Sequence, residues 1–154
     1  MKKILLIIIF SISIIGSSYG ASSYSGSGSS NYDKGASLIK KAKKLEKKDK
    51  IEKANKRYEK AFEYLIKSNK ETPNQPDTLN YLGYTSRKLG NFEIAEKYYL
   101  EGLKIKPDHN GINEYLGELY IKTNRIDLAK QRLEVLKTCN CEEYDELKEL
   151  IDNN

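Results

Sequence analysis

The chain opens with an apolar run over residues 4–15 that follows a short basic start. Ser18 and Gly20 then supply the small residues that a signal peptidase reads just before its cut. The run is shorter than the roughly 20 apolar residues that span a bilayer comfortably. The pattern favours a secretory signal over residues 1–20, cleaved after Gly20, rather than a permanent anchor. It predicts a protein exported to the periplasm or cell envelope.

Helical periodicity begins after a Ser- and Gly-rich segment, residues 21–32, which we expect to be a flexible tether. Apolar residues at three- and four-residue spacing then mark one face of a helix: Leu38, Ile39, Ala42 and Leu45. The rhythm slips at residues 47–50 and then restarts, so two helices or one bent helix both fit. Pro73 ends the second stretch, and we assign residues 33–75 to one basic helical region.

The rest of the chain follows a period of 34 residues. Three pairs stand one period apart: Leu82-Gly83 with Leu116-Gly117, Tyr81 with Tyr115, and Ala95 with Ala129. Small residues at these places allow two antiparallel helices to pack closely, while large apolar residues fill the space between them. Gly90 is predicted to end a helix in the left-handed conformation. Asp108 or Asn110 is the candidate cap of the helix that follows Pro107.

These residues give two segments, 76–109 and 110–141, a resemblance to the tetratricopeptide repeat. The first carries the motif in Leu82-Gly83, Ala95-x-x-x-Tyr99 and Pro107, and the second in Leu116-Gly117-x-x-Tyr120 and Ala129-x-x-x-Leu133. The chain departs from the family's usual residue types at three positions, Ser86, Gly102 and Cys141. A worn upstream unit keeps only its second helix, and its first helix is degenerate or lengthened. The resemblance implies an all-α fold, a short α-solenoid of antiparallel helix pairs.

The last segment, residues 142–154, has the pattern of an amphipathic helix with Tyr144, Leu147 and Leu150 on its apolar side. A stack of repeats needs such an element to cover its final unit. We therefore predict a capping helix at this end and a basic helix at the other end of the solenoid. The ending is similar to that of small exported bacterial tetratricopeptide proteins in which a Cys-Glu-Glu-Tyr turn opens the last helix.

In tetratricopeptide proteins the first helix of each unit lines a concave groove that holds a peptide or a helix of another protein, and the resemblance implies the same here. By repeat position the groove residues are Asp77, Asn80, Tyr84, Arg87 and Lys88 in one unit and Glu114, Glu118, Ile121 and Lys122 in the next. Tyr84 stands where the family's clamp for a terminal carboxylate has asparagine, so a C-terminal peptide ligand is not expected. The leading hypothesis is an exported protein–protein interaction module.

Charge is distributed unevenly along the chain. Residues 31–70 contain 14 Lys and Arg against 6 Asp and Glu, whereas residues 139–154 contain 1 against 6. A basic segment such as residues 40–60 can bind an anionic membrane surface or cell wall, which gives an alternative function as a surface tether. A solvated lysine-rich helix is the simpler interpretation. Nucleic-acid binding is not expected of an exported chain without a reading motif.

The side chains that could carry chemistry are few. Cys139 and Cys141 are the only cysteines, and an exported pair can persist as a disulfide, an alternative left open beside two free thiols. A metal site is disfavoured, because zinc needs more ligands than Cys-x-Cys supplies. His109, the only histidine, is interpreted as a solvated turn residue. Without a nucleophile and base or a carboxylate pair, we expect neither an enzyme nor a cofactor.

Overall fold

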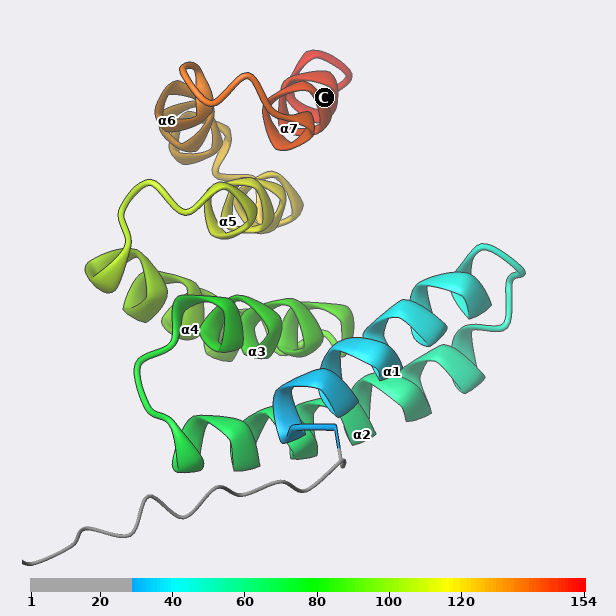
Figure 1. Ribbon diagram of the computed structural model, residues 1–154. Coiled ribbons are helices and arrows are strands. Elements are labelled where there is room, and N and C mark those ends of the chain that lie inside the picture. The colour runs from blue at the N-terminus through cyan, green and yellow to red at the C-terminus, as the bar shows by residue number, and fades with distance from the viewer. Residues whose placement is uncertain (1–28) are drawn as a thin grey trace, which may run out of the picture.

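A computed structural model describes residues 29–154, which form seven helices. Their bounds are α1 Asn31–Glu46, α2 Ile51–Glu71, α3 Pro76–Lys88, α4 Phe92–Ile105, α5 Asn110–Lys122, α6 Ile126–Leu136 and α7 Glu142–Asp152. Consecutive helices pair as hairpins, α1 with α2, α3 with α4 and α5 with α6, and α7 lies against α5 and α6 (Figure 1). The predicted all-α fold, a short α-solenoid, is confirmed.

The predicted signal over residues 1–20 lies outside the described residues. None of the helices from residue 29 onward is long and apolar enough to cross a membrane. Two clusters of buried apolar side chains run through the stack, one centred on the first hairpin and α3, the other on α4, α5 and α6.

Helix α1 begins earlier than the sequence pattern indicated. The Ser30 hydroxyl accepts a hydrogen bond from the Asp33 backbone N–H, and the Asp33 carboxylate accepts one from the Ser30 backbone N–H, each at 3.1 Å. This reciprocal capping box starts the helix at Asn31. The tether predicted for residues 21–32 is therefore wrong over its last two residues, because the capping pair was not recognised.

The turn between the first two helices settles the alternative left open at residues 47–50. Those residues form a turn in which Asp49 adopts a positive φ of 57°, so the region holds two helices rather than one bent helix. The turn after α3 contains Gly90 with φ 82°, the left-handed conformation predicted for it. That conformation suits glycine because it lacks the Cβ that would clash there.

The first two hairpins each close around a glycine that faces a large side chain. A Cβ atom at Gly83 on α3 would collide with the ring of Tyr99 on α4, which is fully buried. Gly35 on α1 faces Leu65 on α2 in the same way, with a Cβ falling 2.8 Å from Leu65 Cγ. These close approaches fix the distance between the paired helices, since no larger residue fits without displacing the partner.

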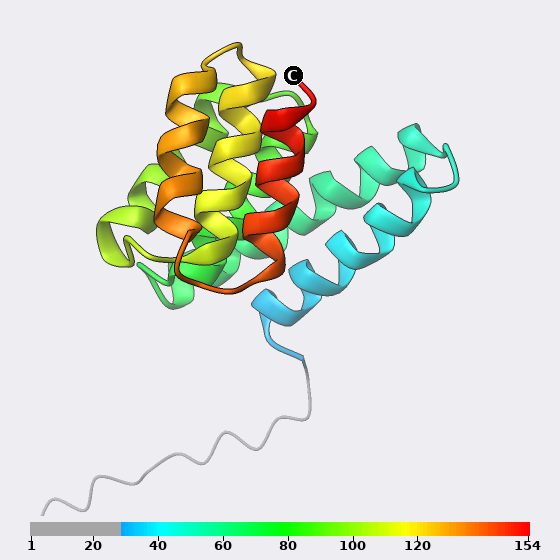
Figure 2. The ribbon, with the colours of Figure 1, turned by 90° about the horizontal axis from the view of Figure 1, so that it is seen from above.

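The first hairpin is a lengthened version of the second. Leu65 follows Gly35 by 30 residues, whereas Tyr99 follows Gly83 by 16. The difference of 14 residues amounts to about two extra turns on each helix between the glycine contact and the tip of the hairpin. The extra turns carry the tip of the hairpin beyond the neighbouring helices, as Figure 2 shows for the end where α1 meets α2. They also explain why α1 has no counterpart at the 34-residue period.

We expect the substitution Gly83→Ala to lower the free energy of unfolding by about 1–3 kcal/mol, because the added methyl group forces the buried Tyr99 ring to move. Urea denaturation followed by circular dichroism measures the change. The control is Ser37→Ala on the exposed side of α1, where we expect a change within about 0.5 kcal/mol. Equal stabilities of wild type and Gly83→Ala would show that the close approach does not constrain the pair.

Candidate functional site

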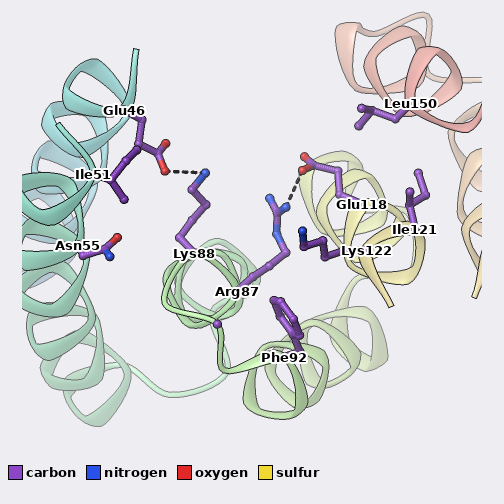
Figure 3. Close-up of a pocket in the computed structure, with 11 residues that line it drawn as sticks. Glu46, Ile51, Asn55, Arg87, Lys88, Phe92, Glu118, Ile121, Lys122 and Leu150 are labelled. Atoms are coloured by element: carbon purple, nitrogen blue, oxygen red, sulfur yellow. Dashed lines mark hydrogen bonds and ion pairs between the residues drawn. The ribbon is translucent and has the colours of Figure 1, made fainter. Parts of the chain in front are cut away.

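A pocket of about 480 Å³ opens between the projecting tip of the first hairpin and the C-terminal ends of α3 and α5. Figure 3 shows its lining side chains, which come from α1, α2, α3, α4, α5 and α7. Four of them are apolar: Ile51, Phe92, Ile121 and Leu150. Ile51 is 49% exposed and Leu150 is 43% exposed, so much of this apolar surface is in contact with water. The volume of the pocket falls in the range of about 300–1,000 Å³ that is usual for ligand pockets.

Two ion pairs connect α3 to the walls of the pocket. Lys88 Nζ lies 2.7 Å from Glu46 Oε1 at the end of α1. Arg87 Nη1 lies 2.6 Å from Glu118 Oε2 on α5. The Tyr58 hydroxyl donates a further hydrogen bond of 2.9 Å to Glu46. The end of α3 forms the floor of the pocket, and α1 and α5 form parts of its walls. Because Lys88 and Arg87 bond to opposite walls, they hold both in place.

A stack of aromatic rings and cations fills the middle of the predicted groove. The rings of Tyr84 and Tyr115 have centroids 4.9 Å apart, and the Arg87 guanidinium carbon lies 5.4 Å from the first and 5.5 Å from the second. Lys43 of α1 reaches over Tyr84 at 4.8 Å and bonds to the Tyr115 hydroxyl at 3.2 Å. Burial raises the pKa of Tyr84 well above its usual value. The chain's own side chains therefore occupy this stretch.

The structure brings five of the nine predicted groove residues together at the pocket: Arg87, Lys88, Glu118, Ile121 and Lys122. It places the other four elsewhere: Asp77, Asn80, Tyr84 and Glu114. Tyr84 is 4% exposed and Glu114 is 3% exposed, so neither is available to a ligand. Asp77 is exposed but lies at the N-terminal end of α3, away from the pocket.

Sequence reasoning missed the half of the site that comes from outside the two regular repeats. Glu46, Ile51 and Asn55 lie in the added turns of the first hairpin, and Leu150 lies on α7. The signal that could have revealed them is Gly35, which faces Leu65 as Gly83 faces Tyr99. This pair of contacts aligns the first hairpin with the second. Phe92 was missed because it begins α4, the second helix of its repeat, whereas the groove residues were taken only from the first helix of each repeat.

The sequence comparisons bear on the middle of the chain. Its residues 76–109 match the family model described as Tetratricopeptide repeat. Helices α3 and α4 form a tetratricopeptide repeat. The match covers the first of the two segments in which the motif was recognised, and the assignment of residues 110–141 stays a prediction. No curated protein matches the chain.

Several solved structures share the fold of the described residues at low sequence identity. The first TPR of Spaghetti (RPAP3) bound to HSP90 peptide SRMEEVD has a TM-score of 0.56 at 20% identity, over 80% of this chain and 95% of that one. The Arabidopsis OM64 TPR domain gives 0.51 at 13% identity, over 80% and 98%. The Yersinia enterocolitica type III secretion translocator chaperone SycD gives 0.50 at 18% identity, over 79% and 88%.

His109 joins the tetratricopeptide repeat of α3 and α4 to the next hairpin. Its Nδ1 accepts the Ile112 backbone N–H at 3.2 Å, which makes His109 the cap of α5. Its Nε2 then carries the proton and donates to Asp77 Oδ1 at 2.9 Å. The prediction of a solvated turn residue is wrong, since the side chain is 12% exposed, and so is the assignment of the cap to Asp108 or Asn110. Both ring nitrogens are occupied.

The end of α6 is joined to the start of α7 by a disulfide between Cys139 and Cys141, whose Cα atoms are 5.2 Å apart. Cys141 is also the residue that precedes the first turn of α7. Among residues 29–154, no cluster of His, Cys, Asp or Glu side chains could hold a metal ion. The pair therefore shapes the connection to the last helix.

Helix α7 packs against α5 through Leu147. A Cβ at Gly117 would fall 2.6 Å from Leu147 Cδ2, so the glycine lets α7 approach closely. Glu114, one turn earlier on α5, is buried beside it. Burial, a hydrogen bond with Glu146 and the negative charge of Glu118 raise the pKa of Glu114 to about 9. At neutral pH this carboxyl is protonated and donates to Glu146, which joins α5 to α7.

The raised pKa predicts how stability depends on pH. The folded protein binds one more proton than the unfolded chain between the ordinary pKa of 4.5 and about 9. The stabilising contribution is complete below the lower value and is lost as pH rises through about 9. We expect Glu114→Gln, which stays neutral, to flatten this decline and to be more stable than wild type at alkaline pH.

Urea denaturation at a series of pH values measures the effect. Glu93→Gln, which removes an exposed carboxylate of α4, is the control and should keep the wild-type slope. A decline of equal steepness in Glu114→Gln and wild type would contradict the assignment of the proton to Glu114.

Proposed function

We propose that this chain is an exported protein-interaction module whose pocket receives an apolar side chain of a partner polypeptide. The observation that carries the proposal is the set of four apolar side chains, Ile51, Phe92, Ile121 and Leu150, that line an open pocket together with charged residues. Exposed apolar surface of this kind, rimmed by polar groups, is typical of a protein-binding site.

The charges around the pocket favour one orientation of the partner. Lys88 and Arg87 are neutralised by Glu46 and Glu118. Lys122 is exposed and forms none of the ion pairs found in residues 29–154. A partner with an apolar side chain followed by a carboxylate would fill the pocket and pair with Lys122. Full burial of one leucine-sized side chain contributes about 1.5–3 kcal/mol, enough to make such a residue the main anchor.

The similar fold of the first TPR of Spaghetti supports a polypeptide ligand as a class, because that domain is bound to an HSP90 peptide. Our proposal places the ligand of this chain in the pocket at the projecting tip of the first hairpin. Tyr84, Tyr115, Arg87 and Lys43 fill the middle of the concave surface here, so the pocket at the projecting tip is the open part.

We expect Ile51→Ser combined with Leu150→Ser to weaken partner binding by about 10- to 100-fold, because two exposed apolar contacts are removed while the folded core is untouched. Peptides selected from a displayed random library on the wild-type chain serve as the probe. Their dissociation constants for wild type and variant are measured by fluorescence anisotropy.

The control variant combines Ile105→Ser with Val135→Ser, which removes two apolar residues of similar exposure, 46% and 39%, away from the pocket. It should bind the selected peptides like wild type. Peptides that bind the two double variants equally well would place the site outside the pocket and overturn the proposal.

Export is the second part of the proposal, supported by the apolar run over residues 4–15 and the small residues before Ala21. We expect the chain recovered from the envelope fraction of expressing bacterial cells to begin at Ala21. Mass spectrometry of the intact protein measures this, and Gly20→Pro should block the cut. Recovery of the chain with residues 1–20 still attached, in the cytosolic fraction, would contradict export.

A further inference from the structure

Two rows of basic residues run along the first hairpin at a regular spacing. Lys34, Lys41 and Lys48 stand seven residues apart along α1 and its following turn. Lys53, Lys60 and Lys67 stand seven residues apart along α2, with Arg57 between the first two. Because seven residues make about two turns of helix, the members of each row lie on one side of their helix.

The two rows belong to the same broad face of the hairpin. Lys34 from α1 and Lys67 from α2 both reach the ring of Tyr64, with their ammonium groups 5.8 Å and 5.5 Å from its centroid. The opposite face of the hairpin carries Asn55 into the pocket and Phe62 against Tyr98 of α4. The rows therefore point away from the rest of the stack.

We define the basic face by the seven residues of these rows: Lys34, Lys41, Lys48, Lys53, Arg57, Lys60 and Lys67. All seven residues are exposed, and none forms an ion pair in the part of the chain that the structure describes. Two acidic residues lie in line with the α2 row: Glu63, between Lys60 and Lys67, and Glu71 at the end of the row, where it accepts a hydrogen bond of 2.6 Å from Asn31. Between Lys53 and Lys67 the row extends about 20 Å.

We propose that the basic face docks on a membrane surface rich in anionic phospholipid. The charges lie in two rows on side-by-side helices, so they match the broad layer of lipid headgroups rather than a single strand of a polymer. Tyr64 lies among them as the kind of aromatic side chain that resides at a membrane interface. The contact leaves the pocket, on the other face of the hairpin, open to a partner.

This surface differs from the segment 40–60 that the charge pattern indicated. Lys43 is turned inward over Tyr84, and Glu46 belongs to the pocket, so neither contributes to the basic face. Lys34 and Lys67 lie outside that segment and do contribute. The face is a property of the folded hairpin and not of a stretch of sequence.

The experiment is sedimentation with vesicles, using the chain from Ala21 onward, which contains all seven helices. One set of vesicles contains phosphatidylglycerol in phosphatidylcholine and the other contains phosphatidylcholine alone. We expect binding only to the first set, weakening as salt is raised. The variant Lys41→Glu/Lys53→Glu/Lys60→Glu should bind about 100-fold more weakly, since each basic residue near an anionic surface strengthens binding by about fivefold.

The matched control, Lys97→Glu/Lys104→Glu/Lys130→Glu, changes the net charge equally at exposed positions of α4 and α6. It should stay within about fivefold of wild type, because its changed residues do not face the membrane. Circular dichroism establishes that both variants are folded. Absence of binding to anionic vesicles at low salt, equal losses in both variants, or binding of heparin in place of vesicles would each overturn the proposal.

Discussion

The close approach of helices at one small residue is the constraint on which the rest of this structure depends. Gly35 faces Leu65, Gly83 faces Tyr99 and Gly117 faces Leu147, so the same contact is made three times along the stack. In the first two cases the large side chain comes from the second helix of the hairpin. In the third it comes from α7. The last helix is thereby fixed against α5, and this contact brings Leu150 to the wall of the pocket.

The charged and polar groups of the interior follow from that packing. Helices held this close leave little room for water, so Arg87 lies against two neighbouring tyrosine rings with Glu118 as its partner. Glu114 is covered by α7 and is kept in its neutral form. The cost of burying these groups is offset because each has a partner on a neighbouring helix. The same bonds that satisfy them also join one hairpin to the next.

The regular part of the fold could be predicted from the sequence, because Leu82-Gly83 and Ala95 recur one period later and fix helices α3 to α6. The first hairpin could not be aligned with them, since its added turns shift every residue of α1 out of the 34-residue register. The site was half predicted for the same reason. Repeat position identifies which residues belong to first helices. It does not reveal that α1 covers Tyr84 or that α7 covers Glu114, because these are contacts between distant parts of the chain.

The added turns of the first hairpin have a geometric property of their own. Seven residues are close to a whole number of helical turns, so an addition of that size on each helix extends the pair without rotating its faces. The apolar side continues to meet the partner helix, and the outward sides keep their separate characters, one toward the pocket and one toward solvent. The length of the two helices can therefore change without changing the directions in which their faces point. Two turns added to or removed from each helix would change the height of the pocket wall while the stack beneath it remains the same.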